Sequence, residues 1–132
     1  KSGLTLFNTE PILRGGAWKQ DSAVSNRENK SYTKAIVFDN DDYIEFDNSA
    51  GYTHFKATVF PQKGGWGGDD RMLLQVLSGD EDEIYVTDDI YYDTRAFDID
   101  VDISGYDKVR LKSTPVSNTY YAYIAIANAR FE

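Results

Sequence analysis

The sequence contains no cysteine, and this excludes several classes of protein at once. None of the 132 residues is Cys, so the chain can hold neither a disulfide framework nor a Cys-ligated zinc site, and it has no cysteine nucleophile. It also lacks any run of 18 apolar residues, so no transmembrane helix and no membrane insertion are expected. The chain begins with Lys rather than Met, and we therefore expect it to be a piece of a longer protein without its signal peptide.

Positive charge is scarce in the second half of the chain. Residues 1–66 carry eight basic and eight acidic side chains, whereas residues 67–132 carry six basic and fourteen acidic ones, which gives the net charge of −8. A phosphate backbone or an anionic lipid surface would be repelled, so neither nucleic acid nor a membrane is an expected partner. The alternative interpretation is that the acidic excess serves only to keep the protein soluble.

Catalytic motifs are missing as well. The sequence has one histidine, His54, and no G-x-S-x-G elbow, P-loop or H-E-x-x-H motif. Carboxylates are so abundant that no particular pair indicates a glycosidase site, although residue type alone does not exclude one. The sequence therefore predicts a protein that is not an enzyme, and a hydrolase ranks last among the functions considered.

Strand patterns dominate what is present. In residues 97–103, apolar side chains alternate with Asp98, Asp100 and Asp102, as expected of an antiparallel strand with one wet face. Residues 52–60 alternate in the same way, and no amphipathic helix of three turns is evident. The other predicted strands are residues 4–7, 32–38, 42–46, 71–77, 83–86, 109–111 and 120–131.

Glycine-containing turns separate these short strands, and many short strands at such spacing predict a sandwich or a barrel. The fold class predicted is all-β, an antiparallel β-sandwich formed by one domain over residues 1–132. Residues 8–31 are the least regular stretch, and we expect them to be an irregular surface loop region.

A glycine-rich segment around Trp66 is the most unusual local feature. Trp66 has two glycines on each side, so a large apolar ring sits on a permissive backbone. An exposed ring there could stack on a sugar, with Asp69 and Arg71 bonding the hydroxyls; a ring folded back onto the sandwich is an equal alternative. The predicted ligand-binding residues are Trp18, Trp66, Asp69, Arg71, Tyr91, Asn118 and Tyr120.

Clustered acidic residues raise the question of calcium. Asp39, Asp41 and Asp42 occupy a predicted turn, and carboxylates in loops are ligands for this hard cation. The EF-hand pattern fails, because the twelfth position counted from Asp39 is Ala50. These three residues are the predicted metal site, with turn carboxylates of an acidic protein as the alternative.

Several segments taken in order resemble the NPCBM family of carbohydrate-binding modules. They are residues 32–36, 42–46 and 51–55, then 97–105 and 108–111, which are similar to the family's V-D-V-S-G and L-x-L strand pair, and the final strand at 127–131. The resemblance implies a jelly-roll sandwich like the galactose-binding domains. It also implies a non-catalytic module of a secreted or surface-bound bacterial protein, which some relatives combine with a structural calcium ion.

The sequence departs from the family pattern in its last strand and near residue 36. Members commonly have an Asp-His pair and a Trp where this chain has Ala122, Tyr123 and Ile126, and Ala35 replaces a Gly. Two functions therefore stay open. The first is a carbohydrate-binding module whose partner is a glycan or polysaccharide; the alternative is a protein–protein interaction or structural module whose partner is another protein of a cell-surface assembly.

Overall fold

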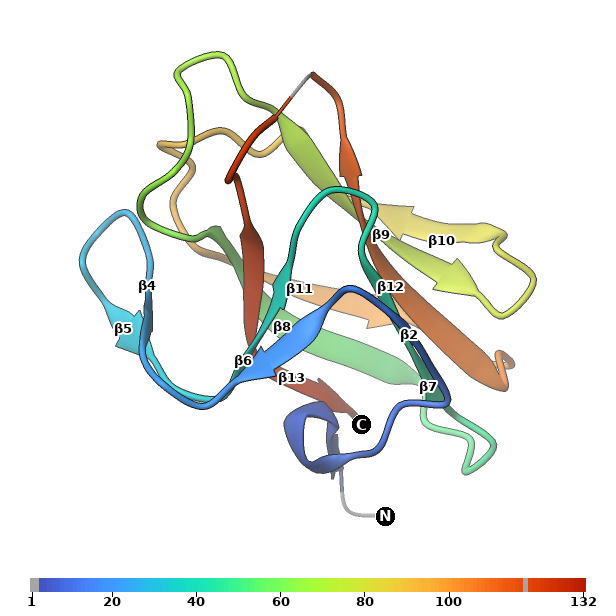
Figure 1. The fold of residues 1–132 in the computed structure, drawn as a ribbon. Helices are drawn as coiled ribbons and strands as arrows, with labels where there is room; N and C mark the ends of the chain where they lie inside the picture. The colour runs from blue at the N-terminus through green and yellow to red at the C-terminus, as the bar shows by residue number, and fades with distance from the viewer. Residues whose placement is uncertain (1–2, 118) are drawn as a thin grey trace.

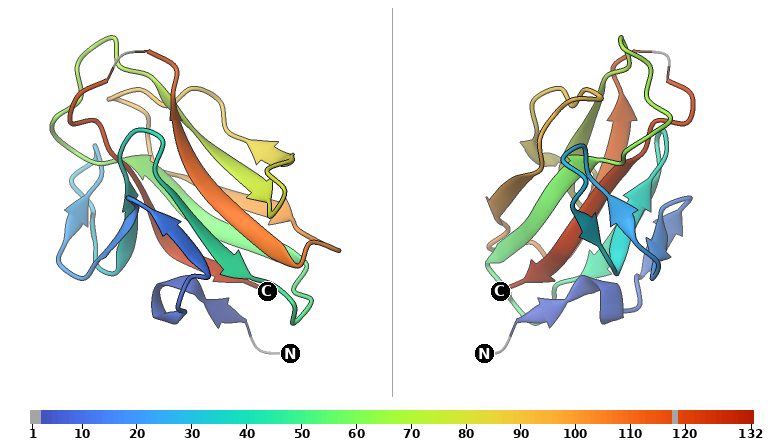
Figure 2. Two further views of the ribbon diagram at one scale, coloured as in Figure 1. Left: turned by 45° about the vertical axis from the view of Figure 1, so that its right-hand side comes forward. Right: turned by 90° about the vertical axis from the view of Figure 1, so that its left-hand side faces the viewer.

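The computed structural model describes residues 3–117 and 119–132, and it shows two antiparallel β-sheets packed face to face (Figures 1 and 2). We call the two layers sheet A and sheet B. In spatial order, sheet A contains β11 (Phe97–Asp102), β8 (His54–Pro61), β13 (Ile124–Phe131), β6 (Ala35–Phe38) and β3 (Trp18–Gln20), with β1 (Leu4–Thr5) beside β13. Sheet B contains β10 (Glu83–Val86), β9 (Met72–Ser78), β12 (Lys108–Pro115), β7 (Tyr43–Asp47) and β2 (Leu13–Gly15). The predicted all-β sandwich is thus confirmed.

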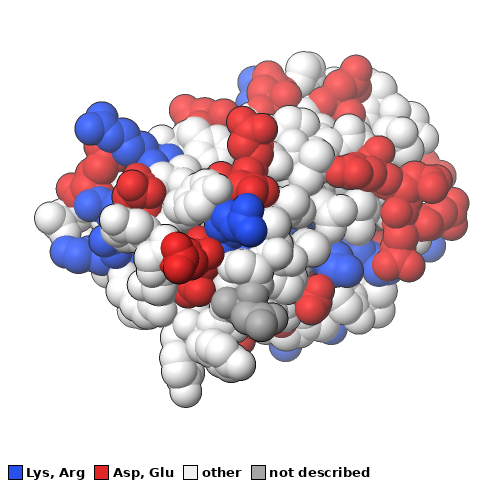
Figure 3. All heavy atoms as spheres, turned by 90° about the horizontal axis from the view of Figure 1, so that it is seen from above, with Lys and Arg blue, Asp and Glu red and all other residues white. Residues whose placement is uncertain are grey.

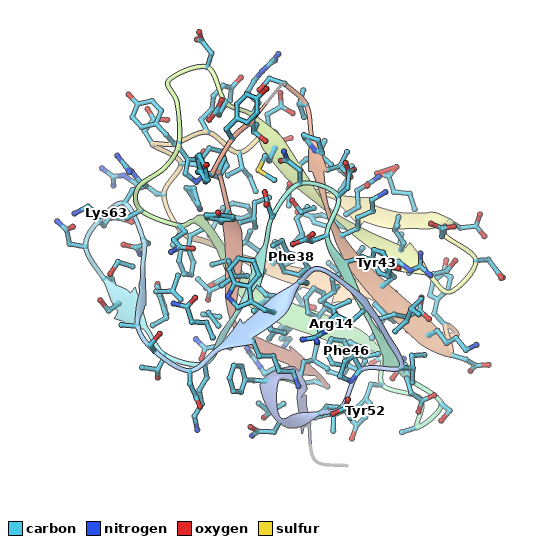
Figure 4. All side chains as sticks on the ribbon, in the orientation of Figure 1. Arg14, Phe38, Tyr43, Phe46, Tyr52 and Lys63 are labelled. Carbon is cyan, nitrogen blue, oxygen red and sulfur yellow. The ribbon has the colours of Figure 1, made fainter. Side chains whose placement is uncertain are left out.

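The main core lies between the two sheets and is built by strand alternation. Along β11, Ile99 and Val101 are buried while Asp98 and Asp100 are exposed, which is the pattern that the sequence predicted. Phe131 stands at the centre of an aromatic cluster at one end of this core, with its ring centroid 6.4 Å from Phe46, 6.2 Å from Phe55 and 6.2 Å from Tyr52. Figure 4 labels Phe46 and Tyr52 at this lower end of the molecule. Each fully buried ring contributes about 1.5–3 kcal/mol of hydrophobic stabilisation.

A second, smaller core covers part of the outer face of sheet A. Ala35 and Val37 of β6, Phe60 of β8 and Ala125 of β13 are buried although they point away from the main core. A hairpin formed by β4 (Val24–Ser25) and β5 (Ser31–Tyr32) covers them, with Val24 fully packed. Figure 2 shows the hairpin as a small two-stranded ribbon outside the two main sheets.

The connecting loops gather at the two ends of the strands. The turns that follow β6, β8, β10 and β12 lie together at the top of Figure 1, while the chain termini lie at the bottom. At the opposite end from the upper loops, buried Asn48 donates from Nδ2 to the carbonyls of Tyr52 (2.9 Å) and Tyr106 (3.0 Å). These two hydrogen bonds tie the loops at the lower end together.

Two stretches differ from the sequence-based expectation. Residues 8–31 are more regular than expected. Within them, β2 is an edge strand of sheet B, β3 is an edge strand of sheet A, and β4 forms half of the hairpin. These strands have only two or three residues, too few for an alternating pattern to appear in the sequence. The last strand begins at Ile124 rather than at residue 120, and Tyr121 lies in the preceding loop with a positive φ of 59°.

Among the described residues, none belongs to a helix of the length and apolarity that crossing a membrane requires.

One ion pair on the outer face of sheet B provides a stability test. Glu45 is 5% exposed, and its Oε1 accepts from Arg110 Nε at 2.9 Å on the neighbouring strand. Replacing Arg110 with Met leaves a buried carboxylate without its cation. We expect Arg110→Met to lower the free energy of unfolding by about 3 kcal/mol. Arg130→Met, whose partner Glu132 is half exposed, is the control and should cost less than about 1 kcal/mol. Urea denaturation of both variants measures the difference, and equal losses would contradict the assignment.

Candidate functional site

The four loops at the top of the sandwich form the candidate site, and we call them the upper loop cluster. They comprise the described residues 39–42, 62–71, 87–96, 116–117 and 119–123, and they join β6 to β7, β8 to β9, β10 to β11 and β12 to β13 (Figure 1). Binding residues are often carried by loops that a rigid scaffold positions, and here the two sheets supply that scaffold.

Hydrogen bonds between loops hold the cluster in one arrangement. The Asn40 side-chain amide donates to the carbonyl of Thr119 at 3.0 Å, and the Thr119 hydroxyl donates back to Asn40 Oδ1. The Ser117 hydroxyl accepts from the backbone N–H of Arg71 at 2.9 Å and donates to the carbonyl of Asp69 at 3.3 Å. Because each bond joins residues from different loops, the surface between them is preorganised.

Two adjacent tyrosines project from this surface. Tyr120 is 77% exposed and Tyr121 is 73% exposed. The sequence analysis placed them in a strand, where neighbours point to opposite faces; the loop conformation instead leaves both rings accessible. The positive φ of Tyr121 is a strained conformation for an aromatic residue. Gly65 on the facing loop allows the Tyr121 backbone to approach closely, because an added Cβ would lie 2.1 Å from the Tyr121 carbonyl oxygen.

Trp66 folds back onto the sandwich rather than standing free. Its ring is partly buried and packs against the main core, which decides between the two arrangements that the sequence left open. The indole Nε1 is covered, and no described residue accepts a hydrogen bond from it. Trp66 therefore anchors the glycine-rich loop, and its buried donor costs about 1–3 kcal/mol because it is unpaired.

Three further predicted ligand residues lie in the upper loop cluster. Asp69 has an exposed side chain, and Arg71 is half-buried with its Nη1 3.6 Å from Asp89 Oδ2. Tyr91 is 38% exposed, and its backbone N–H donates to the Thr94 hydroxyl at 2.9 Å. The structure thus brings Asp69, Arg71, Tyr91 and Tyr120 to one end of the molecule.

Of the remaining two predicted residues, Trp18 does not join them. Trp18 lies on β3, where it makes an edge-to-face contact with Tyr123 at 5.6 Å between centroids and donates from Nε1 to Gln20 Oε1 at 3.2 Å. It belongs to the smaller core rather than to an exposed platform. Asn118 lies outside the described residues.

The three aspartates predicted as a metal site form the tight turn between β6 and β7. Asp42 Oδ2 accepts from the backbone N–H of Asp39 at 2.8 Å, and Asp39 Oδ1 accepts from that of Asn40 at 2.7 Å. Asp42 Oδ1 packs against Gly16, where a Cβ would lie 2.1 Å away. Burial raises the pKa of the Asp42 carboxyl, with the neighbouring carboxylates adding to the effect.

The Asp39 and Asp42 carboxylates thus accept hydrogen bonds from backbone N–H groups of the turn itself. Over residues 3–117 and 119–132, no group of three or more His, Asp or Glu side chains is arranged to hold a metal ion. The arrangement therefore does not fit a calcium cage, and calcium binding by Asp39, Asp41 and Asp42 stays a prediction.

Charge around the upper loop cluster is uneven. Seen from above in Figure 3, acidic side chains gather at the right-hand edge, and basic side chains are concentrated toward the left. The right-hand edge is the side of the β9–β10 turn, which contains residues 80–83, all of them acidic. This face therefore carries charges of both signs and no single dominant one.

Sequence reasoning expected only one ring of the Tyr120–Tyr121 pair to be available, and it missed the roles of Gly65 and Ser117. Their roles come from contacts between loops that are about 50 residues apart along the chain. No local pattern encodes such contacts. The one available signal was Tyr120, where a polar stretch ends in two aromatic residues.

The model of the NPCBM/NEW2 domain family matches residues 14–132 of the sequence. The sequence matches no curated protein.

Solved structures similar to the chain include several carbohydrate-binding modules. The CBM51 module of Clostridium perfringens GH95, in complex with methyl-galactose, superposes with a TM-score of 0.79 at 14% identity and covers 99% of this chain and 100% of that one. The tandem CBM51 modules of Sp3GH98, a family 98 glycoside hydrolase from Streptococcus pneumoniae, give a TM-score of 0.80 at 21% identity, with coverage of 98% and 46%. At these identities the likeness shows a shared fold.

A third similar structure carries a different sugar. It contains the CBM51-2 domain in complex with GlcNAc and the INT domains of Clostridium perfringens ZmpB, with a TM-score of 0.77 and 19% identity. The match covers 98% of this chain and 31% of that one. This chain therefore spans about a third of the ZmpB structure and just under half of the Sp3GH98 structure.

The contact between Gly65 and Tyr121 can be tested with two alanine variants. Gly65→Ala forces a Cβ into the Tyr121 carbonyl and also strains a residue whose φ is +79°. Gly64→Ala is the matched control, because its φ is +94° but nothing lies within 4 Å of its Cβ. We expect Gly64→Ala to cost about 1 kcal/mol of stability and Gly65→Ala clearly more, with altered near-ultraviolet circular dichroism from the displaced tyrosines. Equal melting temperatures for the two variants would contradict the contact.

The anchoring role of Trp66 predicts opposite effects for two substitutions. Trp66→Phe keeps an aromatic ring against the core and removes the unpaired N–H, so the melting temperature should stay equal or rise. Trp66→Ala removes the packing and should lower stability by about 1–3 kcal/mol. Thermal unfolding of both variants measures this, and an unchanged Trp66→Ala would mean that the ring is not an anchor.

Proposed function

This chain belongs to the NPCBM/NEW2 domain family, and from that premise we propose that it is a non-catalytic module that binds a carbohydrate at its upper loop cluster. The observation that carries the placement is the pair of tyrosines that stand 77% and 73% exposed on a loop that Ser117 hydrogen-bonds to the facing β8–β9 loop. Aromatic rings are costly to leave in water, so a rigid loop that presents two of them favours a binding role.

The chemistry of the surface suits a sugar. A pyranose ring offers a face of C–H groups that can pack on an aromatic ring, and its rim offers hydroxyls that need hydrogen-bonding partners. Tyr120 and Tyr121 supply the rings and two phenolic hydroxyls, and the exposed Asp69 supplies an acceptor on the facing loop. Affinity at such an open site should be weak, because one sugar buries little surface.

The sugars bound in two of the similar structures support this proposal. One module is in complex with methyl-galactose and another with GlcNAc. Both have the fold of this chain, in which loops at one end of a sandwich are free to vary. Galactose-type and N-acetylhexosamine-type sugars are therefore the first ligands to test. An extracellular setting, within a longer bacterial protein that acts on or adheres to glycans, fits this role.

A glycan array probed with the domain tests the proposed function, followed by calorimetry with methyl-galactose and GlcNAc. We expect specific glycan binding, and Tyr120→Ala should weaken it about tenfold by removing a stacking platform worth about 1 kcal/mol or more. Tyr106→Ala is the matched control, since Tyr106 is an exposed tyrosine at the opposite end of the molecule.

The outcomes separate the functions that the sequence left open. Binding that is lost in Tyr120→Ala and kept in Tyr106→Ala would support the proposed site. Binding that survives both changes would move the site elsewhere. No glycan binding by a folded domain would contradict the proposal and favour a protein-interaction module.

A further inference from the structure

An open groove crosses the outer face of sheet A, beside the upper loop cluster, which contributes only Ala96 to its lining. It consists of two hollows of about 420 and 380 Å³ that share Thr58, Asp98 and Asn128 in their linings. Strands β11, β8 and β13 form the floor, and the β4–β5 hairpin forms one wall through Asn26, Glu28, Lys30 and Tyr32. Each hollow lies within the roughly 300–1,000 Å³ of small-molecule sites.

The groove exists because the hairpin covers only part of this face. Where β6, β8 and β13 expose apolar side chains outward, the hairpin packs on them; where β8 and β11 expose polar ones, the face stays open. The cross-strand neighbours Thr58 and Asp98 lie at this boundary, with the Thr58 hydroxyl donating to Asp98 Oδ1 at 2.6 Å. The open half of the sheet therefore meets a wall, which makes a groove rather than a flat surface.

A β-bulge places an asparagine at the middle of the groove. The pairing of β13 with β8 shifts register between Ala127 and Arg130, and Asn128 within that shift has a φ of 55°. It is exposed and lines both hollows. Bulges that re-aim a side chain are frequent beside binding sites, and a non-glycine residue with positive φ stores strain.

The Asn128 amide is available to a ligand. Its backbone carbonyl accepts from Arg130 Nη1 at 2.9 Å, but no described residue bonds to its side chain. The basic groups nearby are already engaged, because Lys56 Nζ lies 3.0 Å from Glu132 Oε1 and Arg130 Nε lies 2.6 Å from Glu132 Oε2. These bonds, from Arg130 first and then from Lys56, hold the pKa of the Glu132 carboxyl below its usual range.

The lining is polar and locally neutral, although the whole chain is acidic. Three basic side chains (Lys30, Lys56 and Arg130) face three acidic ones (Glu28, Asp98 and Asp100). None of the large hydrophobic residues that the chain leaves exposed lines either hollow, so a protein would find no apolar anchor there. An uncharged ligand rich in hydroxyls matches an amide, a hydroxyl and carboxylates placed in a row.

We propose that this groove is a second glycan site, which takes a stretch of a neutral, linear oligosaccharide. Asn128 donates and accepts through its amide, Asp98 accepts from sugar hydroxyls, and Tyr32 flanks one end from the hairpin. The two hollows in series accommodate consecutive sugar units, whereas the projecting tyrosines of the upper loop cluster offer a platform to one. The groove site does not depend on sugar binding at the upper loop cluster.

Nuclear magnetic resonance of the ¹⁵N-labelled domain tests this proposal, with cellohexaose, xylohexaose and mannohexaose added separately as neutral linear probes. We expect at least one of them to shift the backbone amides of Thr58, Asp98 and Asn128, and to leave those of Gly65 and Tyr121 in place. Methyl-galactose and GlcNAc serve as the contrasting probes for the upper loop cluster.

Two variants then measure the contribution of the groove side chains. Asn128→Gly removes the amide at a position whose φ glycine adopts without strain, and Asp98→Asn keeps the shape while removing the charge. We expect each to weaken hexasaccharide binding at least fivefold. Asp102→Asn, on the same face of β11 but outside both hollows, should change binding less than twofold.

The outcomes distinguish the two sites. Absence of shifts in the groove with all three hexasaccharides would overturn the second site and leave the proposed function standing. The same holds for shifts confined to the upper loop cluster, or for unchanged affinity in Asn128→Gly and Asp98→Asn. Shifts in the groove without any response of the upper loop cluster to the monosaccharides would support the groove and contradict the proposed function.

Discussion

The strict alternation of side chains along β-strands is the constraint on which the arrangement of this molecule depends. Every strand residue of sheet A must face either sheet B or the outside. Ala35, Val37 and Phe60 fall on the outer side, so the outside of sheet A carries an apolar patch that water would penalise. The β4–β5 hairpin answers this requirement by packing Val24 over the patch. The wall of the groove is thus a consequence of the register of the sheet.

The hairpin also connects this outer face with the upper loop cluster. Lys63, labelled at the left of Figure 4, donates from its backbone N–H to the carbonyl of Ser25 at 2.8 Å, and its ammonium group bonds to Asn29. On the other side, the guanidinium of Arg27 lies 5.4 Å from the centroid of the Tyr92 ring. The hairpin that walls the groove thus also touches the β8–β9 and β10–β11 loops.

The sequence predicted what depends on local pattern and missed what depends on distant contacts. Residues 97–103 alternate so regularly that their strand and its wet face follow from periodicity alone. The edge strands β2 and β3 escaped notice, because three residues carry no period and their partners lie far along the chain. Within the candidate site, Tyr120 could be identified as a polar-loop aromatic. The anchoring of Trp66 could not, because its neighbours are brought together only by the fold.

Unsatisfied buried polar groups gather on the β8–β9 loop of the upper loop cluster, and this distribution argues for function there. Among the described residues, the buried side-chain polar atoms without a hydrogen-bond partner belong to Gln62, Trp66 and Ser113. The first two lie on the β8–β9 loop, and the strained Tyr121 lies against the same loop. Buried polar groups without hydrogen bonds and strained backbone conformations cost stability. They occur in folded proteins chiefly where a function requires them. The main core beneath this loop shows no such departure, because its phenylalanine rings are buried and its side chains follow the regular alternation of the strands. The conformation that this loop keeps at this cost places Gly65 against the β12–β13 loop, which carries the two exposed tyrosines of the proposed site.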